Sequence, residues 1–314
     1  MFAFNVDNIA IERCAKKFGA AVAKNILPSV EHLLKVLNVK PALSYLEIHL
    51  VDHCNLNCKG CSHFAPIADE WFADTNEYAR DMQQLRKLFL TIHKIRLLGG
   101  EPLLHPKIAR FMFFTRSCFP KADVRIVTNG IILHRMPHLF WKACRAYSIG
   151  IDFTVYPPLF KKEKFLVKMA NEKGVKIYPR RASSVQTFYN LKGNSDPNVG
   201  YQICCHRGYA NTPNLREGKF YICPAPSVIH YFNKRYGTQI PSAGYVDIYA
   251  PNLSGWDVRK ILYRGSATCR YCTAGWNHIP KSPWSTSKLH ISEWDAATRS
   301  SKQTVVNGSS TKSD

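Results

Sequence analysis

The chain contains no run of about 18 or more apolar residues, the length that a membrane-spanning helix requires. Its first residues, Met1–Asp7, lack the basic start and apolar core of a secretory signal. We therefore expect a cytoplasmic protein. Because that compartment keeps thiols reduced, the 11 cysteines point to metal ligation rather than to disulfides.

Acidic residues are scarce as well. The chain has 22 Asp and Glu against 43 Lys and Arg, which gives a formal net charge of +21 at pH 7. Such a charge attracts anions, chiefly at low salt, so phosphorylated or nucleotide-linked molecules, nucleic acid and an anionic membrane surface are candidate partners. The basic residues are spread along the chain, which is typical of a solvated surface. No RNA-binding module of aromatic and basic residues is visible, and we expect no nucleic-acid partner.

Three cysteines stand close together after the strand-like residues 46–51. Cys54, Cys58 and Cys61 have the spacing C-x3-C-x2-C. Soft thiolates select iron–sulfur clusters, zinc or copper(I). A structural zinc site needs four closed ligands, commonly in C-x2-C pairs. Three thiolates can instead hold three irons of a [4Fe–4S] cluster and leave the fourth iron open to a small molecule.

This run resembles the signature of the radical S-adenosylmethionine (SAM) superfamily, and two further segments match in order. Gly99, Gly100, Glu101 and Pro102 follow the strand-like residues 95–98, as the SAM-amine-binding motif of that family does. The segment Thr128-Asn129-Gly130 stands where the family ends its third strand, so Asn129 joins the candidate cofactor-binding residues.

One position departs from the family pattern. The residue before the third cysteine is usually aromatic and contacts the adenine of SAM, but here it is Gly60. His63 or Phe64 is expected to take that place, unless the contact is absent.

The resemblance implies a chemistry. A reduced cluster cleaves SAM to methionine and a 5′-deoxyadenosyl radical, which abstracts hydrogen from an unreactive C–H bond. The cofactors carry this step while the protein orients the substrate, and a reductant such as flavodoxin or ferredoxin is implied. A side chain on a later strand is expected to hold the carboxylate or ribose of SAM, with Thr154, Tyr156 and Arg180 as candidates by position.

The fold class that the pattern predicts is α/β. From about residue 44, short apolar strands alternate with amphipathic helical segments; the strands are expected at residues 46–51, 95–98, 124–127, 149–156 and 175–178. Such alternation indicates parallel β/α units, whose sites lie at the carboxyl ends of the strands. The family resemblance implies a partial (β/α)6 radical SAM barrel.

Four regions are expected: an N-terminal helical extension (1–43), the barrel (44–200), an auxiliary-cluster domain (201–280) and a C-terminal extension with a disordered polar tail (281–314). The extension has apolar residues at three- and four-residue steps with basic residues between them. A helix packed on one end of the barrel is favoured, and contact with a membrane surface, which would make the protein peripheral, is the alternative.

A second set of cysteines lies in the last third. Cys269 and Cys272 form a C-x2-C pair, Cys223 follows the turn-like residues 216–219, and Cys204 and Cys205 precede that turn. Zinc held by four cysteines is the inorganic alternative. The layout resembles the twitch domain, a shortened SPASM extension built of a β-hairpin and helix, and its spacing is close to that of the amino-cyclitol dehydrogenases of butirosin biosynthesis.

That second resemblance implies an auxiliary [4Fe–4S] cluster on Cys205, Cys223, Cys269 and Cys272, with Cys204 as the alternative to Cys205. Four protein ligands leave no open iron, which favours electron transfer. A dehydrogenase would pass the electron of the substrate radical to this cluster, whereas an epimerase would return hydrogen from a thiol. Cys204 is the candidate hydrogen donor, and Asp152, Arg180, His206 and Arg207 are candidate proton acceptors or substrate anchors.

The leading hypothesis is a radical SAM oxidoreductase, either a dehydrogenase or an epimerase, acting on a small polyhydroxylated substrate such as a sugar, amino-cyclitol or nucleotide-sugar. A peptide-modifying maturase is the second, although such enzymes usually carry more cysteines and often an N-terminal peptide-binding domain, for which too few residues precede the first strand. The third is a non-catalytic iron–sulfur binding protein, against which the intact motifs count. Substrate identity and oligomeric state stay open.

Overall fold

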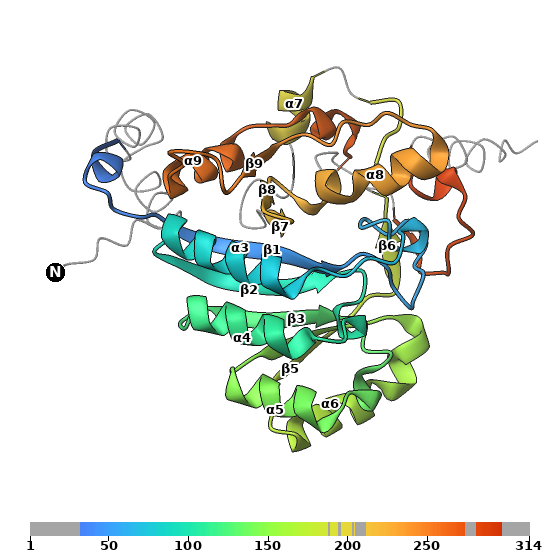
Figure 1. Cartoon of the computed structure of the whole chain (residues 1–314). Coiled ribbons are helices and arrows are strands. Elements are labelled where there is room, and N and C mark those ends of the chain that lie inside the picture. Colours follow the sequence, from blue (N-terminus) through green and yellow to red (C-terminus); the bar gives the residue numbers. More distant parts are fainter. Residues whose placement is uncertain are drawn as a thin grey trace, which may run out of the picture.

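An eight-stranded sheet organises the molecule, with its strands in the order β5-β4-β3-β2-β1-β7-β8-β9 (Figure 1). The computed structural model describes residues 32–187, 189–193, 196–202, 204, 212–273 and 281–296. The strands are β1 (Ala42–Val51), β2 (Thr91–Gly99), β3 (Asp123–Thr128), β4 (Gly150–Val155), β5 (Ile177–Arg181), β7 (Asn214–Arg216), β8 (Lys219–Tyr221) and β9 (Tyr245–Asp247). Strands β1 to β5 and β7 run parallel, while β7, β8 and β9 pair antiparallel.

Helices connect the parallel strands. The α-helices are α3 (Thr75–Leu88), α4 (Ile108–Cys118), α5 (His138–Ala146), α6 (Glu163–Glu172), α7 (Pro197–Gln202), α8 (Pro224–Tyr236) and α9 (Gly255–Lys260). Short 3₁₀ helices cover Ala65–Ile67, Pro102–Leu104, Leu133–Arg135, Pro157–Lys162, Ile261–Tyr263, Ala267–Tyr271 and Ile291–Glu293. A separate two-stranded sheet pairs β6 (Ser184–Gln186) with β10 (Lys281–Pro283). Figure 1 places α5 and α6 at the β5 end of the large sheet.

The two faces of the large sheet differ in chemistry. On one face, apolar side chains of β1 to β4 pack against α3, α4, α5 and α6 in the main core; they include Leu46, Ile48, Leu97, Ile126 and Phe153. The alternate residues form what we call the polar face, made of Tyr45, Glu47, Arg96, Asp123, Arg125, Asp152, Thr154, Tyr178 and Arg180. Parallel strands covered on both faces read as continuous apolar runs, so this alternation marks a sheet with one polar side.

The predicted alternation of strands and helices is confirmed, and with it the α/β fold class. Strands β1 and β2 begin earlier than expected because their first residues alternate with polar ones instead of forming an apolar run. The segment 181–200 contains β6 and part of α7. Asp74 caps α3, since its carboxylate accepts from the backbone N–H groups of Asn76 at 2.8 Å and Glu77 at 2.9 Å.

The sheet continues across the boundary expected near residue 200. Asn214 of β7 pairs with Glu47 of β1, on the side of β1 away from β2. The predicted turn at residues 216–219 joins β7 to β8. Its two central residues, Glu217 and Gly218, both have positive φ, as a two-residue type I′ hairpin requires. The parallel β7 therefore extends the barrel sheet into the region of the second cysteine set.

A buried carboxylate joins these regions. Asp52, just after β1, is 1% exposed and accepts hydrogen bonds from Arg216 Nη2 at 2.7 Å and the Tyr231 hydroxyl at 2.8 Å. His49 Nδ1 lies 3.2 Å from the other carboxylate oxygen. Burial alone raises the pKa of Asp52, but His49 and Arg216 outweigh it and hold the pKa well below its usual range. Asp52 thus ties β1 to β7 and α8.

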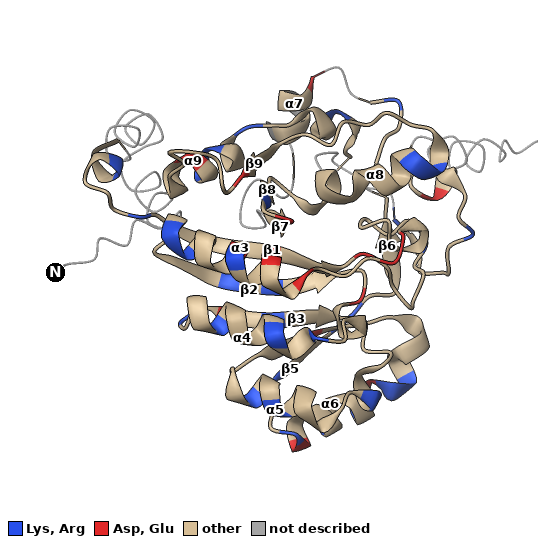
Figure 2. Cartoon of the chain, in the orientation of Figure 1, with Lys and Arg blue, Asp and Glu red and all other residues tan. Residues whose placement is uncertain are grey.

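The basic residues are distributed over the helices of the barrel rather than gathered in one block (Figure 2). No helix in the described ranges is long and apolar enough to cross a membrane. The helical extension expected over residues 1–43 lies mostly outside the described residues, as does the tail beyond residue 296.

Replacing Asp52 by Asn should lower the free energy of unfolding by about 3 kcal/mol, because it removes the carboxylate charge that Arg216 faces in a buried position. Urea denaturation measures the change. The matched control is Asp69→Asn: Asp69 pairs with Lys234 at 2.7 Å on the surface, where the loss should stay below about 1 kcal/mol. Equal losses in the two variants would contradict the role given to Asp52.

Candidate functional site

Cys54, Cys58 and Cys61 lie on a loop, residues 54–61, that leaves the carboxyl end of β1; we call it the cysteine loop. All three are free thiols. Cys54 Sγ accepts from the backbone N–H of Leu56 at 3.5 Å and from Asn129 Nδ2 at 3.4 Å. Cys58 Sγ accepts from the indole N–H of Trp284 at 3.1 Å. Because an indole nitrogen can only donate, Cys58 Sγ is the acceptor in this contact, while the Cys54 thiol also donates to Asn55 Oδ1 at 3.9 Å.

Burial has a further consequence for these thiols. It raises the pKa of Cys54 and of Cys58 to about 12, and it raises that of Cys61 against the opposing backbone N–H groups nearby. As free thiols they stay protonated near neutral pH, whereas binding a cationic metal centre displaces the protons. Three half-buried cysteines with N–H donors around their sulfurs therefore fit the ligand set of an iron–sulfur cluster.

The predicted Gly-Gly-Glu-Pro segment lies directly against this loop. Gly99 has φ of +142°, and a Cβ there would come 2.0 Å from the Val51 carbonyl oxygen. A Cβ on Gly100 would come 2.1 Å from the carbonyl oxygen of His53. Gly100 and Glu101 donate their N–H groups to the carbonyls of Val51 at 2.6 Å and His53 at 3.0 Å. Both positions need glycine because the backbone that leads into Cys54 lies where a side chain would be.

Glu101 connects the three motifs. Its carboxyl group is fully buried and accepts from Leu103 N at 3.0 Å, Thr128 Oγ1 at 2.7 Å and Asn129 N at 2.9 Å. Burial raises the pKa of Glu101 to about 7, although the three donors act in the opposite direction. Asn129 in turn donates to Asn55 Oδ1 at 2.8 Å and to Cys54 Sγ. The structure thus brings together the motifs that the sequence placed on three separate strands, with Pro102 buried at the start of the adjoining 3₁₀ helix.

Tyr156 lies at the same edge, just after β4. Burial is the largest cause of its raised pKa, and the charges of Cys58, Cys61 and Cys54 raise it further. Its ring centroid is 6.2 Å from that of Trp284. Arg180, which acts in the opposite direction on this pKa, pairs in register with Thr154. Arg180 forms no ion pair with a carboxylate in the described part of the chain.

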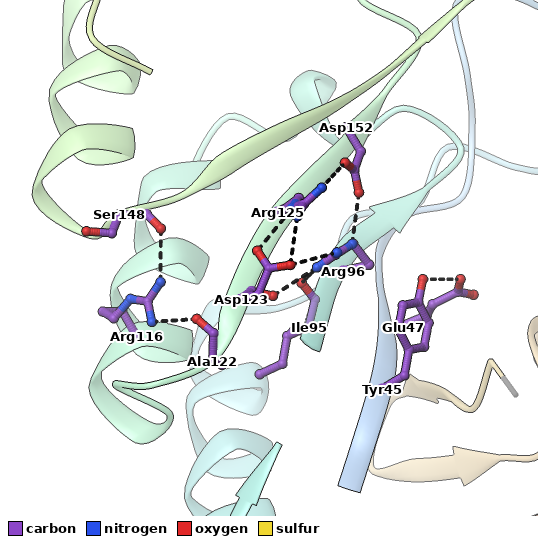
Figure 3. A network of polar contacts seen from close by, with 10 residues as sticks. All are labelled: Tyr45, Glu47, Ile95, Arg96, Arg116, Ala122, Asp123, Arg125, Ser148 and Asp152. Atoms are coloured by element: carbon purple, nitrogen blue, oxygen red, sulfur yellow. Dashed lines mark hydrogen bonds and ion pairs between the residues drawn. The ribbon is translucent and has the colours of Figure 1, made fainter. Parts of the chain in front are cut away.

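Below this edge the polar face holds a network of charges (Figure 3). Arg96 contacts Asp123 at 3.0 Å and Asp152 at 2.8 Å. Arg125 contacts the same two carboxylates, each at 2.9 Å. The guanidinium of Arg125 also lies over the Tyr178 ring, 3.7 Å from its centroid. Both oxygens of Asp152 are held by guanidinium groups, so the geometry supports an ion-pair role for this predicted proton acceptor.

The second cysteine set also comes together. Cys223 precedes α8, and Cys269 and Cys272 lie in and after the 3₁₀ helix Ala267–Tyr271. Burial raises the pKa of Cys223 well above its usual value, and the neighbouring Cys272, Cys269 and Cys204 raise it further. Cys205, His206 and Arg207 lie outside the described residues. Within the described ranges no three ligand side chains surround a single ion; a cluster spreads its ligands over separate irons.

The prediction that Phe64 contacts the adenine does not agree with its packing. Phe64 is fully buried, with its ring centroid 4.9 Å from Tyr189, 5.1 Å from Phe232 and 6.2 Å from Trp294. The Phe64 ring is therefore part of a hydrophobic cluster and does not face the SAM site. His63 lies next to it, with its ring 5.1 Å from that of His49.

Sequence reasoning missed Trp284 and the charges of the polar face. Trp284 stands 226 residues after Cys58, and no spacing pattern links the two. The charges did leave a signal, because polar and apolar residues alternate over residues 45–49 of β1, 94–97 of β2, 123–126 of β3 and 151–155 of β4.

Comparison with known proteins gives a family match. The model of the Radical SAM superfamily matches residues 48–173. GTP 3′,8-cyclase of Microcystis aeruginosa is 30% identical over 124 residues, which are 38% of this chain and 37% of that protein. Molybdenum cofactor biosynthesis protein 1 of Bos taurus is 34% identical over 123 residues, 38% of this chain and 19% of that protein. The chain therefore spans well under half the length of these curated relatives.

Among solved structures, the crystal structure of BtrN in complex with AdoMet and 2-DOIA has 17% identity and a TM-score of 0.47, and the match covers 77% of this chain and 100% of that one.

The family match contains the whole network from the cysteine loop to Asn129. The donors around the sulfurs and the apposed glycines fit the cofactors of that family, a [4Fe–4S] cluster and SAM. Residues 48–173 thus match the Radical SAM superfamily, and the cysteine loop, the Gly-Gly-Glu-Pro segment and Asn129 all lie within that match.

Proposed function

We propose that this enzyme abstracts hydrogen from a small polyhydroxylated substrate, such as a sugar, an amino-cyclitol or a nucleotide-sugar, and thereby oxidises or epimerises it. The observation that carries the proposal is the polar face of the sheet. Charged and hydroxyl side chains line it from β1 to β5, directly below the edge that holds the cysteine loop. Such a surface offers hydrogen bonds to hydroxyl groups and repels an apolar substrate.

Arg180 is a candidate to bind an anionic group of the substrate or of SAM. It stands at the carboxyl end of β5 near Tyr156 and has no carboxylate partner in the described ranges. A guanidinium binds carboxylate and phosphate through paired hydrogen bonds. The net charge of +21 favours the same class of ligand. Thr154 beside it is a candidate donor to the ribose or to a substrate hydroxyl.

A second candidate comes from the relatives named for a GTP 3′,8-cyclase. A nucleoside triphosphate also fits a basic site with polar walls, and the reaction would then be a cyclisation. The matched segment is no longer than 124 residues, about the size of the radical SAM domain, so the transformation depends on the remainder of the chain.

The second cysteine set is proposed to hold an auxiliary [4Fe–4S] cluster through Cys223, Cys269 and Cys272 together with Cys205 or Cys204. With every iron held by the protein, such a centre suits electron transfer. In an oxidation the substrate loses a hydrogen atom to the 5′-deoxyadenosyl radical, then a proton to a base and one electron to this cluster. In an epimerisation a thiol returns hydrogen instead, and Cys204 is the candidate only if Cys205 is the cluster ligand.

Replacing Cys54 by Ala should abolish the reductive cleavage of SAM, because the first cluster loses one of its three ligands. Formation of 5′-deoxyadenosine with dithionite under anaerobic conditions measures this. Cys118→Ala is the control: Cys118 ends α4, away from both cysteine sets, and its loss should leave cleavage unchanged. Cleavage that survives in the Cys54 variant would sink the assignment of the site.

Iron analysis tests the auxiliary cluster. Two cubane clusters predict about eight irons per chain, and Cys223→Ala should leave about four. The variant should still cleave SAM but should no longer oxidise substrate. About four irons in the parent protein, with zinc present, would assign the second set to zinc.

The substrate class is tested with a panel of nucleotide-sugars, amino-cyclitols and GTP in deuterated buffer, each with SAM and dithionite. Turnover of a polyol is expected, because the polar face presents hydrogen-bonding groups. Deuterium at a retained carbon indicates epimerisation, and a carbonyl product indicates oxidation. Turnover of GTP alone would replace the proposal by the cyclase candidate.

A further inference from the structure

Residues 281–296, which we call the C-terminal strap, lie across the cysteine loop. The strap begins as β10, which pairs antiparallel with β6, and Trp284 N donates to the Ser183 carbonyl at 2.9 Å. It then runs beside the loop itself. Lys59 N donates to the Ser285 carbonyl at 2.9 Å, and Ser287 N donates to the Asn57 carbonyl at 2.8 Å. The strap thus forms a short antiparallel bridge in which Thr286 pairs with Cys58.

The carboxyl end of the strap is also held against the cysteine loop. The Trp294 side chain is fully buried, and its indole N–H donates to the Cys61 carbonyl at 2.8 Å. A Cβ on Gly60 would lie 2.8 Å from the Glu293 carbonyl oxygen, so the loop needs a glycine where the strap crosses it. Gly60, whose φ is +63°, is the residue at which the family pattern has an aromatic ring. The strap therefore occupies space beside the third cysteine.

One contact of the strap reaches a ligand sulfur. The indole N–H of Trp284 donates to Cys58 Sγ at 3.1 Å, while its ring lies beside Tyr156. We propose that Trp284 is a positioning residue that raises the reduction potential of the [4Fe–4S] cluster through its hydrogen bond to Cys58. The proposal rests on the cluster at the three cysteines and is independent of the proposed substrate.

The sign of the effect on the reduction potential follows from charge. One-electron reduction adds negative charge to the cluster and its thiolates, and a donor N–H stabilises the more negative state more strongly. Removing the donor therefore makes reduction harder. The Tyr156 ring lies beside the Trp284 ring, with the two centroids 6.2 Å apart, and excludes water from that side of the indole, so the N–H acts in a setting of lower dielectric constant.

The test is Trp284→Phe, which keeps an aromatic ring and removes only the donor. In a redox titration followed by EPR, the ratio of reduced to oxidised first cluster at fixed potential should fall about tenfold, a shift of 59 mV to more negative values for a one-electron couple. The first cluster is recognised by the part of the signal that changes on adding SAM, because SAM binds the open iron. An unshifted midpoint in a fully loaded variant overturns the proposal.

The matched control is Trp294→Phe on the same strap. This indole donates to a backbone carbonyl and not to sulfur, so the variant should lose stability while the midpoint stays in place. Equal shifts in the two variants would show that any loosening of the strap moves the potential, which contradicts a specific role for the sulfur contact. Absence of any cluster signal in the parent protein would refute the cluster assignment itself, a separate outcome.

If Trp284→Phe loses its iron, Trp284→His decides the matter, because imidazole keeps a ring N–H. Recovery of iron and of the parental midpoint in the His variant supports the hydrogen bond. A His variant that binds iron with a midpoint shifted to more negative values overturns it, and so does one that fails to bind iron while its fold, judged by circular dichroism, is intact.

Discussion

The contact between the ends of β1 and β2 is the constraint on which the rest of the site depends. Backbone groups of residues 51–53 lie so close to Gly99 and Gly100 that neither glycine has room for a Cβ. The contact fixes the start of the cysteine loop, because Val51 and His53 accept hydrogen bonds from the opposite backbone. Glu101 then fixes the end of β3, because its carboxylate accepts hydrogen bonds from Thr128 and Asn129. The Asn129 side chain in turn donates to Cys54 Sγ.

The polar face has a cost that the remaining contacts offset. Arg96 is 6% exposed, and a guanidinium in that position is tolerated only with carboxylate partners, which Asp123 and Asp152 supply. These pairs keep charged groups oriented under the cysteine edge without leaving any of the four charges isolated. Asp52, at the carboxyl end of β1, likewise supplies a buried carboxylate partner, here for Arg216 of β7. Charge pairing therefore acts together with apolar packing, in which Leu215 and Phe220 belong to the main core, to connect the barrel to the region of the second cysteine set.

Much of this was readable from the sequence, since local signals act over short distances. The alternation of strands and helices and the turn at residues 216–219 depend on neighbours in sequence, and the structure confirms them. The placement of Phe64 could not be read in this way, because its partners Phe232 and Trp294 are distant in the chain. The contact of Trp284 with Cys58 could not be predicted for the same reason. Its function depends on a single contact across 226 positions, which leaves no period or spacing.

The sulfurs of the cysteine loop are held by different parts of the chain. Cys54 receives its donor from the end of β3, Cys58 from the C-terminal strap, and Cys61 from the backbone that follows it. Each ligand therefore reports on a separate region, and the electronic environment of the cluster depends on all of them. A family motif specifies only the three sulfurs. The donors around them come from other parts of the chain, so residues outside the C-x3-C-x2-C spacing determine the hydrogen bonds that Cys54 and Cys58 accept.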